Sequence, residues 1–454
     1  MSNKFINISR QSEIILPPNL KGWLDNTNLA RFIVDVVDQL DTATFEDDYC
    51  GGGSPPYPPK LMLALLFYCY IKGIFSSRQI EIGTYEQVPV IFIANGLHPD
   101  HTSIAAFRKR FINKFKHIFI QILEIAVEMN ILKLGDISID GTKIHANASK
   151  HKAMSWKYAN QLEAQLKKEV ELLLKKAEET SNEALNDIDI PDEIKRREIR
   201  LEKIAEAKKI IKERHAIRYE KEKKEYEEKM KAREKYEENT GQNARGRLPA
   251  APSDEPKDTD QVNFTDEESR IMPLSGGGFE QAYNAQATVD MDSRLIITNH
   301  VTQNTNDKRE VEPMLRELAL LPESCGEVKR AALDSGYHSE ENHNKLADKN
   351  IESYIPSGRQ KHNQWLKEHY GESQSENELA TVIEAAQERM KTKDGKEFYA
   401  KRKSTIEPTF GIIKNVMGFR QFMLRGLKAV SGEWTIVSIA FNLKRLCVLN
   451  LQNV

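Results

Sequence analysis

The stretch ISIDGTKIHANASK, residues 137–150, is the part of the sequence that decides the fold. Ile137 and Ile139 form a short apolar run before Asp140, which predicts a buried strand with a carboxylate at or near its end. An acid in such a place needs a partner or a cation, because burial of an unpaired charge is costly. Asp140 is therefore a candidate functional residue rather than one more surface charge.

Two further acids have equally distinctive surroundings. Asp334 follows an apolar run in RAALDSGYHSEEN, residues 330–342, so a second strand is expected to end at a carboxylate. Glu407, in YAKRKSTIEPTFGIIK (399–414), is followed by a proline and by apolar residues at helical spacing. This pattern predicts a helix that opens near Pro408. Four other acids lie in turn-like or polar surroundings and rank lower as ligands, namely Asp136, Asp290, Asp292 and Asp307.

Three carboxylates from two strands and a helix suit hard divalent cations. Mg²⁺ accepts carboxylate, water and phosphate oxygens, and Mn²⁺ is an alternative. Two such ions would stabilise the entering and the leaving oxygen of an in-line displacement at phosphorus. We therefore predict that Asp140, Asp334 and Glu407 are both the catalytic residues and the metal ligands of a site that cuts nucleic acid.

The order of four motifs resembles that of the DDE transposases of bacterial insertion sequences. The motifs are IDGTKIHANAS (139–149), GGFEQAYNAQATVD (277–290), ALDSGYHS (332–339) and the pattern YxxRxxxxExxxxxxK formed by Tyr399, Arg402, Glu407 and Lys414. The resemblance covers nearly the whole chain. It implies an RNase H-like catalytic domain in which Asp140, Asp334 and Glu407 hold the divalent metals.

The same resemblance implies that Tyr399, Arg402 and Lys414 act in catalysis and in binding DNA ends. The family signature commonly has three residues between its Arg and its Glu. Here four residues separate Arg402 from Glu407, whereas three separate Lys403 from it. The resemblance therefore assigns Lys414 more firmly than Arg402.

Positive charge is concentrated in two stretches, although the net charge of the chain is only −2. FRKRFINKFKH, residues 107–117, has five basic residues and no acid, and residues 399–428 have seven basic residues with Glu407 as the one acid. Such runs can follow a phosphate backbone, or they can be solvated helix faces. The predicted DNA-binding residues are Arg108, Lys109, Arg110, Lys114, Tyr399, Arg402, Lys403 and Lys414.

The region before the first acid has the pattern of short helices. GGGSPPYPPK (51–60) is a turn and helix-entry signal for an apolar helix over 61–71, and a second helix is expected from Ser76 or Ser77 to Ile82. Thr102 or Ser103 is expected to cap a basic helix that begins near residue 104. Short helices of this kind suit a helix-turn-helix-like DNA reader and equally suit an ordinary helical core.

A long charged insertion separates Asp140 from the rest of the core. Apolar residues at helical spacing on either side of SNEALNDIDIPDE (181–193) predict two antiparallel helices folded as a coiled-coil-like arm. The arm could reach a partner subunit or DNA, or remain a solvated hairpin. Residues 238–278 are rich in Pro, Gly, Asp and Asn and are predicted to form a loosely ordered linker.

The remaining core has alternating, strand-favouring runs at 281–289 and 295–301 with a turn at MDSR (291–294), then an amphipathic helix over 309–321. The order of strands and helix matches an RNase H-like sheet. The expected fold is therefore α+β, a mixed sheet with flanking helices. Its predicted parts are a helical N-terminal DNA-binding domain (1–130), two pieces of the catalytic domain (131–155 and 279–454), a helical arm (156–240) and a linker (241–278).

Length and composition agree with a large enzyme that stays in the cytoplasm, in association with the nucleoid. At 454 residues two or three domains are expected. The sequence shows no signal peptide and no obvious membrane span. Its four cysteines are scattered without CxxC spacing, which argues against zinc and against a disulfide framework.

The function that the three acids and the family resemblance together imply is transposition. The enzyme would use two Mg²⁺ ions to cut double-stranded DNA at terminal inverted repeats and to join the freed 3′-hydroxyl to target DNA, with a homodimer as the active complex. Two alternatives remain open at this stage. One is a non-catalytic DNA-binding protein derived from a transposase, and the other is a nuclease that cuts without joining strands.

Overall fold

The computed structural model describes residues 19–49, 55–179, 190–240, 248–274, 276–358 and 382–452. Two compact units make up the chain. Unit 1 combines Met1–Ile144 with Asn284–Val454, and unit 2 is His145–Tyr283. The predicted turn at 51–54 and most of the predicted break in the arm, 181–189, lie outside the described residues. The helical N-terminal region and the strands that carry Asp140 and Asp334 thus share one unit.

The sheet of unit 1 has the strand order expected of an RNase H-like domain. The order along the sheet is β5-β1-β7-β8, and β6 pairs with β5; β1 pairs parallel with β7, β7 pairs parallel with β8, and β5 pairs antiparallel with β6. The strands are β1 (Leu134–His145), β5 (Phe279–Asp290), β6 (Ile296–Thr302), β7 (Gly326–Leu333) and β8 (Glu352–Tyr354). The predicted α+β class with flanking helices is confirmed.

The turn between β5 and β6 forms at the predicted MDSR. The carboxylate of Asp290 accepts hydrogen bonds from the backbone N–H and the hydroxyl of Ser293, at 2.8 and 2.6 Å. Arg294 then adopts a positive φ of 61°, a conformation common in tight turns. Because the turn reverses the chain locally, β6 returns beside β5 with a register from Asn284–Thr302 to Val289–Ile296.

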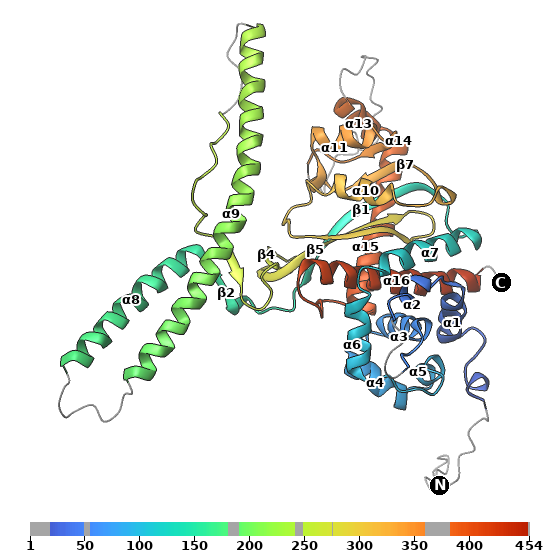
Figure 1. Cartoon of the computed structure of the whole chain (residues 1–454). Helices are drawn as coiled ribbons and strands as arrows, with labels where there is room; N and C mark the ends of the chain where they lie inside the picture. Colours follow the sequence, from blue (N-terminus) through green and yellow to red (C-terminus); the bar gives the residue numbers. More distant parts are fainter. Residues whose placement is uncertain are drawn as a thin grey trace, which may run out of the picture. The chain divides into compact units, whose positions relative to one another are not determined.

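Helices surround this sheet. Those of unit 1 are η1 (Leu20–Gly22), α1 (Leu29–Gln39), α2 (Ala43–Glu46), α3 (Pro59–Ile71), α4 (Ser77–Glu86), α5 (Val88–Ile93), α6 (His101–Arg110), α7 (Phe115–Glu128), α10 (Val311–Leu318), η3 (Glu323–Cys325), η4 (Ser335–Tyr337), α11 (Glu340–Ala347), α13 (Val382–Lys391), α14 (Lys393–Ala400), α15 (Arg402–Gly411), the π-helical η5 (Ile412–Val416) and α16 (Leu427–Gln452). Figure 1 labels most of them.

Helix α16 is the central core helix of unit 1. It packs against β6, α3 and α7, and the amide of Asn442 bonds both the backbone N–H and the carbonyl of Ile296, at 2.8 and 2.7 Å. The indole of Trp434 donates to the carbonyl of Gln286 at 2.9 Å. Among the described helices, α16 is the one long and apolar enough to cross a membrane, but 67% of its most apolar window is buried inside the protein.

The expected N-terminal helices form, with two differences at their starts. Helix α3 covers Pro59–Ile71 and α4 begins at Ser77, but the side chain of Ser76 makes no capping hydrogen bond. Helix α6 begins at His101, and its cap is Asp100, whose carboxylate accepts from the N–H groups of residues 102 and 103. The prediction of a Thr102 or Ser103 cap was wrong because the helix begins earlier than expected, so that Asp100 is its N-cap and residues 102 and 103 already belong to its first turn.

Unit 2 contains the predicted arm. Its elements are η2 (Lys150–Lys152), β2 (Ala153–Ser155), α8 (Trp156–Glu179), α9 (Ile190–Thr240), β3 (Gln261–Asn263) and β4 (Arg270–Pro273). Helices α8 and α9 pack together (Figure 1) through a core that includes Leu162, Leu166 and Ile204. At 1.5 Å per residue, α9 is about 75 Å long and α8 about 36 Å, so α9 continues far beyond its partner helix.

Much of the stretch predicted as a linker is structured. Strand β3 pairs antiparallel with β2, and β4 pairs with the first residues of β5. The guanidinium of Arg218 in α9 donates to both carboxylate oxygens of Asp260, at 2.8 and 2.6 Å, and Val262 joins Trp156 in a buried cluster. Short strands in a Pro- and Gly-rich segment carry little periodicity, which is why the sequence did not indicate them.

Candidate active site

Asp140 and Asp334 are adjacent because of the strand register. The parallel pairing of β1 and β7 ends at Ile139 opposite Leu333, so each acid is the next residue on its own chain. Asp334 directly follows β7, as predicted. Asp140 lies inside the twelve-residue β1 rather than at its end. The pairing of β1 with β7 stops just before Asp140, so its carboxylate is placed as it would be at the end of a strand.

Local backbone groups orient both carboxylates. The Oδ1 atom of Asp140 accepts from the N–H of Gly141 at 2.8 Å. The Oδ1 atom of Asp334 accepts from the N–H of Ser335 at 2.7 Å, and Asp334 thereby caps η4. One oxygen of each acid is thus engaged with its own main chain.

Arg402 connects Asp140 to Glu407. Its Nη2 atom donates to Oδ2 of Asp140 at 2.6 Å and its Nη1 atom to Oε1 of Glu407 at 3.4 Å. The side chain of Arg402 is 10% exposed and that of Glu407 is 50% exposed, while Lys403 is exposed. Despite its four-residue spacing from Glu407, Arg402 is therefore the basic residue that lies among the acids.

The helix that carries Glu407 begins earlier than predicted. Helix α15 starts at Arg402, so Pro408 lies inside it rather than at its opening. A proline there removes one backbone hydrogen bond, and the next residues form a five-residue π-helix, 412–416, an irregularity that is frequent at functional sites. The expectation of a helix opening near Pro408 was wrong because a proline signal does not distinguish a helix start from a tolerated interior position.

Charge and burial set the acidity of the site. Burial raises the pKa of Asp140 to about 6, although Arg402 and the N–H of Gly141 oppose the shift, and the like charges of Asp334 and Asp307 add to it. Burial by itself would lower the pKa of Arg402, but the charge of Asp140 and of the neighbouring acids outweighs it and raises that pKa. Asp140 is thus ionised at neutral pH at an energetic cost that an added cation would relieve.

The donor set fits a divalent cation. Asp140, Asp334 and Glu407 offer hard carboxylate oxygens, and their mutual repulsion is the electrostatic condition that a cation relieves. In the described part of the chain, no three side chains of His, Cys, Asp or Glu already converge on one metal position. Arg402 contacts two of the three acids instead.

Lys414 and Tyr399 also lie near Asp140. Lys414 is in the π-helical segment, and its Nζ atom donates to the carbonyl of Lys143 at 3.0 Å. Burial lowers the pKa of Lys414, and the charge of Lys143 lowers it further, whereas Asp140 raises it. Burial raises the pKa of Tyr399, with Arg402 opposing and the nearby acids adding to the shift.

Sequence reasoning missed the place of Asp307 in a polar group beside these residues. The Oδ1 atom of Asp307 accepts from Nδ2 of Asn284 and from Nε2 of Gln286, both at 2.7 Å, and lies 3.4 Å from Nζ of Lys143. Gly141 passes so close that a Cβ atom there would lie 2.1 Å from Nε2 of Gln286. Asp307 was ranked low because its polar stretch, QNTND, looked like an ordinary turn.

The N-terminal basic run divides into buried and exposed residues. Arg108 is 7% exposed, and its Nη1 atom donates to the hydroxyl of Tyr70 and to the carbonyl of Phe75, at 2.8 and 3.1 Å. We therefore withdraw Arg108 from the DNA-binding residues, because its guanidinium is engaged in the interior. Lys109 is exposed, as is Arg110, which bonds the carbonyl of Asp48; Lys114 pairs with the carboxylate of Asp48 at 2.6 Å.

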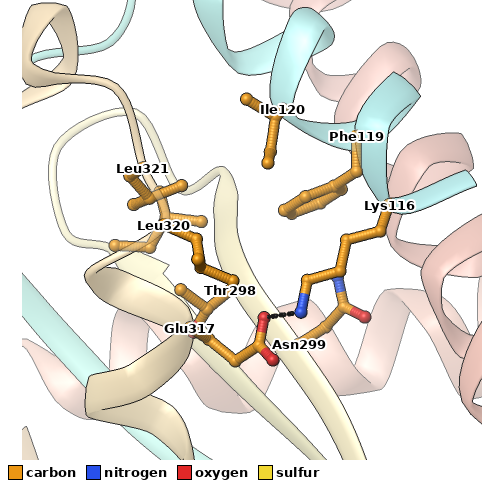
Figure 2. A pocket seen from close by; sticks show the side chains of 9 residues that line it. Lys116, Phe119, Ile120, Thr298, Asn299, Glu317, Leu320 and Leu321 are labelled. Atoms are coloured by element: carbon orange, nitrogen blue, oxygen red, sulfur yellow. Dashed lines mark ion pairs between the residues drawn. The ribbon is translucent and has the colours of Figure 1, made fainter.

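A small pocket of unit 1 is separate from the acidic site. It lies between α7, β6 and the end of α10, and Figure 2 shows an ion pair between Lys116 and Glu317 across it. Its walls are mainly apolar, from Phe119, Ile120 and Leu321. None of the candidate catalytic acids lines it, so it is not part of the proposed site.

Two family models match the chain. The model described as a Transposase DDE domain matches residues 259–443, which include Asp334 and Glu407, and the model described as a Transposase domain (DUF772) matches residues 18–110. Neither the curated proteins nor the solved structures include a match. The two matched ranges together cover more than half of the chain and fall on the region from β3 to α16 and on the N-terminal helices. The chain belongs to the DDE transposases of insertion sequences.

Proposed function

We propose that this protein cuts double-stranded DNA at the terminal inverted repeats of its own element and joins the freed 3′-hydroxyl to target DNA. The observation that carries the proposal is the arrangement of Asp140, Asp334 and Glu407, two on adjacent strand positions and the third held toward Asp140 through Arg402. Both reactions are displacements at phosphorus, so one set of acids can serve them in turn.

In this proposal the three acids hold two divalent ions, Mg²⁺ or Mn²⁺, which supply Lewis acidity at the reacting phosphate. The chain's own residues bind and orient the DNA. Lys414 and Tyr399 lie near Asp140 and would contact the DNA end. Phosphates farther away would be contacted by Lys403, Arg110, Lys114 and Lys109. Arg402 would neutralise the acids before the metal enters.

The test is a strand-cleavage assay on the DNA that flanks the gene. With wild-type protein and Mg²⁺ we expect nicks that leave a 3′-hydroxyl at the ends of the element, followed by joined products with target DNA. EDTA should remove both activities, and Mn²⁺ should restore them. Nicking without joined products would identify a nuclease, and DNA binding without nicking in either metal would identify a non-catalytic DNA-binding protein.

Lys109 offers a direct test of the N-terminal helices as a DNA surface. Its side chain is exposed in the last turn of α6, so Lys109→Gln should remove one phosphate contact without disturbing the core. We expect weaker binding to any duplex, and a slope of log affinity against log salt that is smaller by about 0.9. Fluorescence anisotropy at several salt concentrations measures both. An unchanged slope would show that this helix face does not contact DNA.

The proposed assembly and location follow from the same reaction. Two DNA ends must be held together for transfer, so we propose a homodimer as the active complex and the cytoplasm, in contact with the nucleoid, as its location. Sedimentation of the protein with and without end DNA tests the first part. A species that remains monomeric on paired ends while joined products form would contradict it.

A further inference from the structure

A pair of lysines lies beside the acids. Lys143 is three residues after Asp140 on β1, and its carbonyl accepts a hydrogen bond of 3.0 Å from the ammonium group of Lys414. Burial lowers the pKa of both lysines, and the charge of Lys143 lowers the pKa of Lys414 further. Two neighbouring ammonium groups that are partly buried are a favourable setting for an anion.

Lys143 is held in place by a hydrogen-bonded chain. Its Nζ atom lies 3.4 Å from Oδ1 of Asp307, and the two side chains are 16% and 24% exposed. Asp307 is itself fixed by the amides of Asn284 and Gln286, both at 2.7 Å. The side-chain Oε1 atom of Gln286 in turn accepts from the hydroxyl of Tyr337 at 2.5 Å. The same Oδ1 atom of Asp307 thus receives all three donors, which suits the role of a fixed counter-charge better than that of a metal ligand.

We propose that Lys143 adds a second DNA-phosphate contact next to Asp140, beside Lys414, which the proposed function already places at the DNA end, and that Asp307 is the positioning residue of Lys143. The inference rests on the proposed function, since it names a contact for the DNA that the acids would cut. Lys143 donates to a non-bridging phosphate oxygen, and Asp307 limits the rotation of its side chain. No bond is made or broken by either residue.

The first experiment measures binding to a fluorescein-labelled duplex of the element's flank in EDTA, so that it does not depend on catalysis. We expect Lys143→Gln to weaken binding by about three- to tenfold and to lower the salt slope by about 0.9. Lys414→Gln should behave in the same way. Lys349→Gln, which changes an exposed lysine after α11, is the matched control and should leave the slope unchanged.

The second experiment tests Asp307 by a double-mutant cycle. In the wild-type background, Asp307→Asn should weaken binding about twofold or more, because Lys143 loses its fixed orientation. In the Lys143→Gln background the same change should not weaken binding. If Asp307→Asn tightens binding equally in both backgrounds, Asp307 acts only through its charge and the positioning role is wrong.

The outcomes separate this inference from the proposed function. If wild-type protein cuts DNA but Lys143→Gln keeps the wild-type salt slope and only lowers the melting temperature, the lysine is structural and the subsite is overturned. If wild-type protein does not cut DNA in Mg²⁺ or Mn²⁺ but Lys143→Gln loses one phosphate contact, the subsite stands and the catalytic proposal fails.

Discussion

Replacing Asp140 by Asn is expected to abolish strand cleavage, with a loss of at least about a thousandfold, while duplex binding is retained. The change keeps the size of the side chain but removes the charge that would hold a divalent ion, and catalysis by electrostatic stabilisation commonly loses this much when one group is removed. Single-turnover cleavage of end DNA measures the rate. Asp334→Asn and Glu407→Gln should give the same result.

Asp136 supplies the matched control for this prediction. It lies four residues earlier on β1, but its carboxylate pairs with Arg330, the residue opposite it on β7. The Nε atom of Arg330 donates to Asp136 at 2.8 Å. Asp136→Asn should therefore affect stability more than cleavage. Cleavage by Asp140→Asn at more than a tenth of the wild-type rate would contradict the assignment of Asp140.

The same substitution should stabilise the metal-free protein. Because burial raises the pKa of Asp140 from 3.8 to about 6, the folded state holds its proton more tightly than the unfolded chain does. The cost of ionisation therefore appears as pH rises from about 4 through about 6 and is fully present above that range. At pH 7.5, Asp140→Asn should raise the free energy of unfolding by up to about 3 kcal/mol, and the difference from wild type should vanish near pH 4. Melting curves in EDTA across this range test it.

The order of the core strands and the pairing of the two aspartates could be predicted from the sequence. Apolar runs before Asp140 and Asp334 are typical of buried strands, and the RNase H-like order places these strands side by side. The register then joins Ile139 to Leu333. Each of the two strands is one contiguous buried segment. The hydrophobic pattern of such a segment is the strongest structural signal in a single sequence.

The role of Arg402 and the Asp307 group could not be predicted in this way. Arg402 reaches Asp140 across 262 positions, and Asp307, in the loop after β6, accepts hydrogen bonds from Asn284 and Gln286 of β5. Such contacts depend on side-chain directions after folding, and polar residues in turns show no periodicity. Arg108 was predicted to bind DNA because it lies in a basic run. Its side chain is instead buried in the core.

Replacing Glu433 by Ala is expected to lower the free energy of unfolding by about 3–5 kcal/mol. Glu433 is completely buried in α16, and burial raises the pKa of its carboxyl, with Arg108 opposing the shift. Its Oε1 atom accepts from the hydroxyl of Tyr70 at 3.1 Å, and that hydroxyl accepts from Arg108. Removal of one partner leaves a charged guanidinium in the interior, which is the costly case for buried ion pairs.

Chemical denaturation monitored by tryptophan fluorescence measures this loss, since Trp434 is the residue next to Glu433 and is fully buried. Glu86→Ala, at an exposed position of α4, is the control and should change stability by no more than about 0.5 kcal/mol. Replacing both charges, in Arg108→Met with Glu433→Leu, should recover part of the loss because no unpaired charge remains. A loss of unfolding free energy below about 1 kcal/mol for Glu433→Ala would show that the buried group of Glu433, Tyr70 and Arg108 does not stabilise the fold.

The loss should extend to catalysis, because Glu433 also fixes the chain that follows Lys414. Its Oε2 atom accepts from the backbone N–H groups of Met423 and Leu424, at 2.9 and 3.0 Å. The loop after α3 contacts the same region, where a Cβ atom on Gly73 would lie 2.9 Å from the carbonyl of Met417. Glu433→Gln, which keeps an acceptor for these N–H groups, should therefore cleave DNA faster than Glu433→Ala at a temperature where both are folded. Equal rates would mean that the network stabilises the fold without holding α15, the helix that carries Glu407.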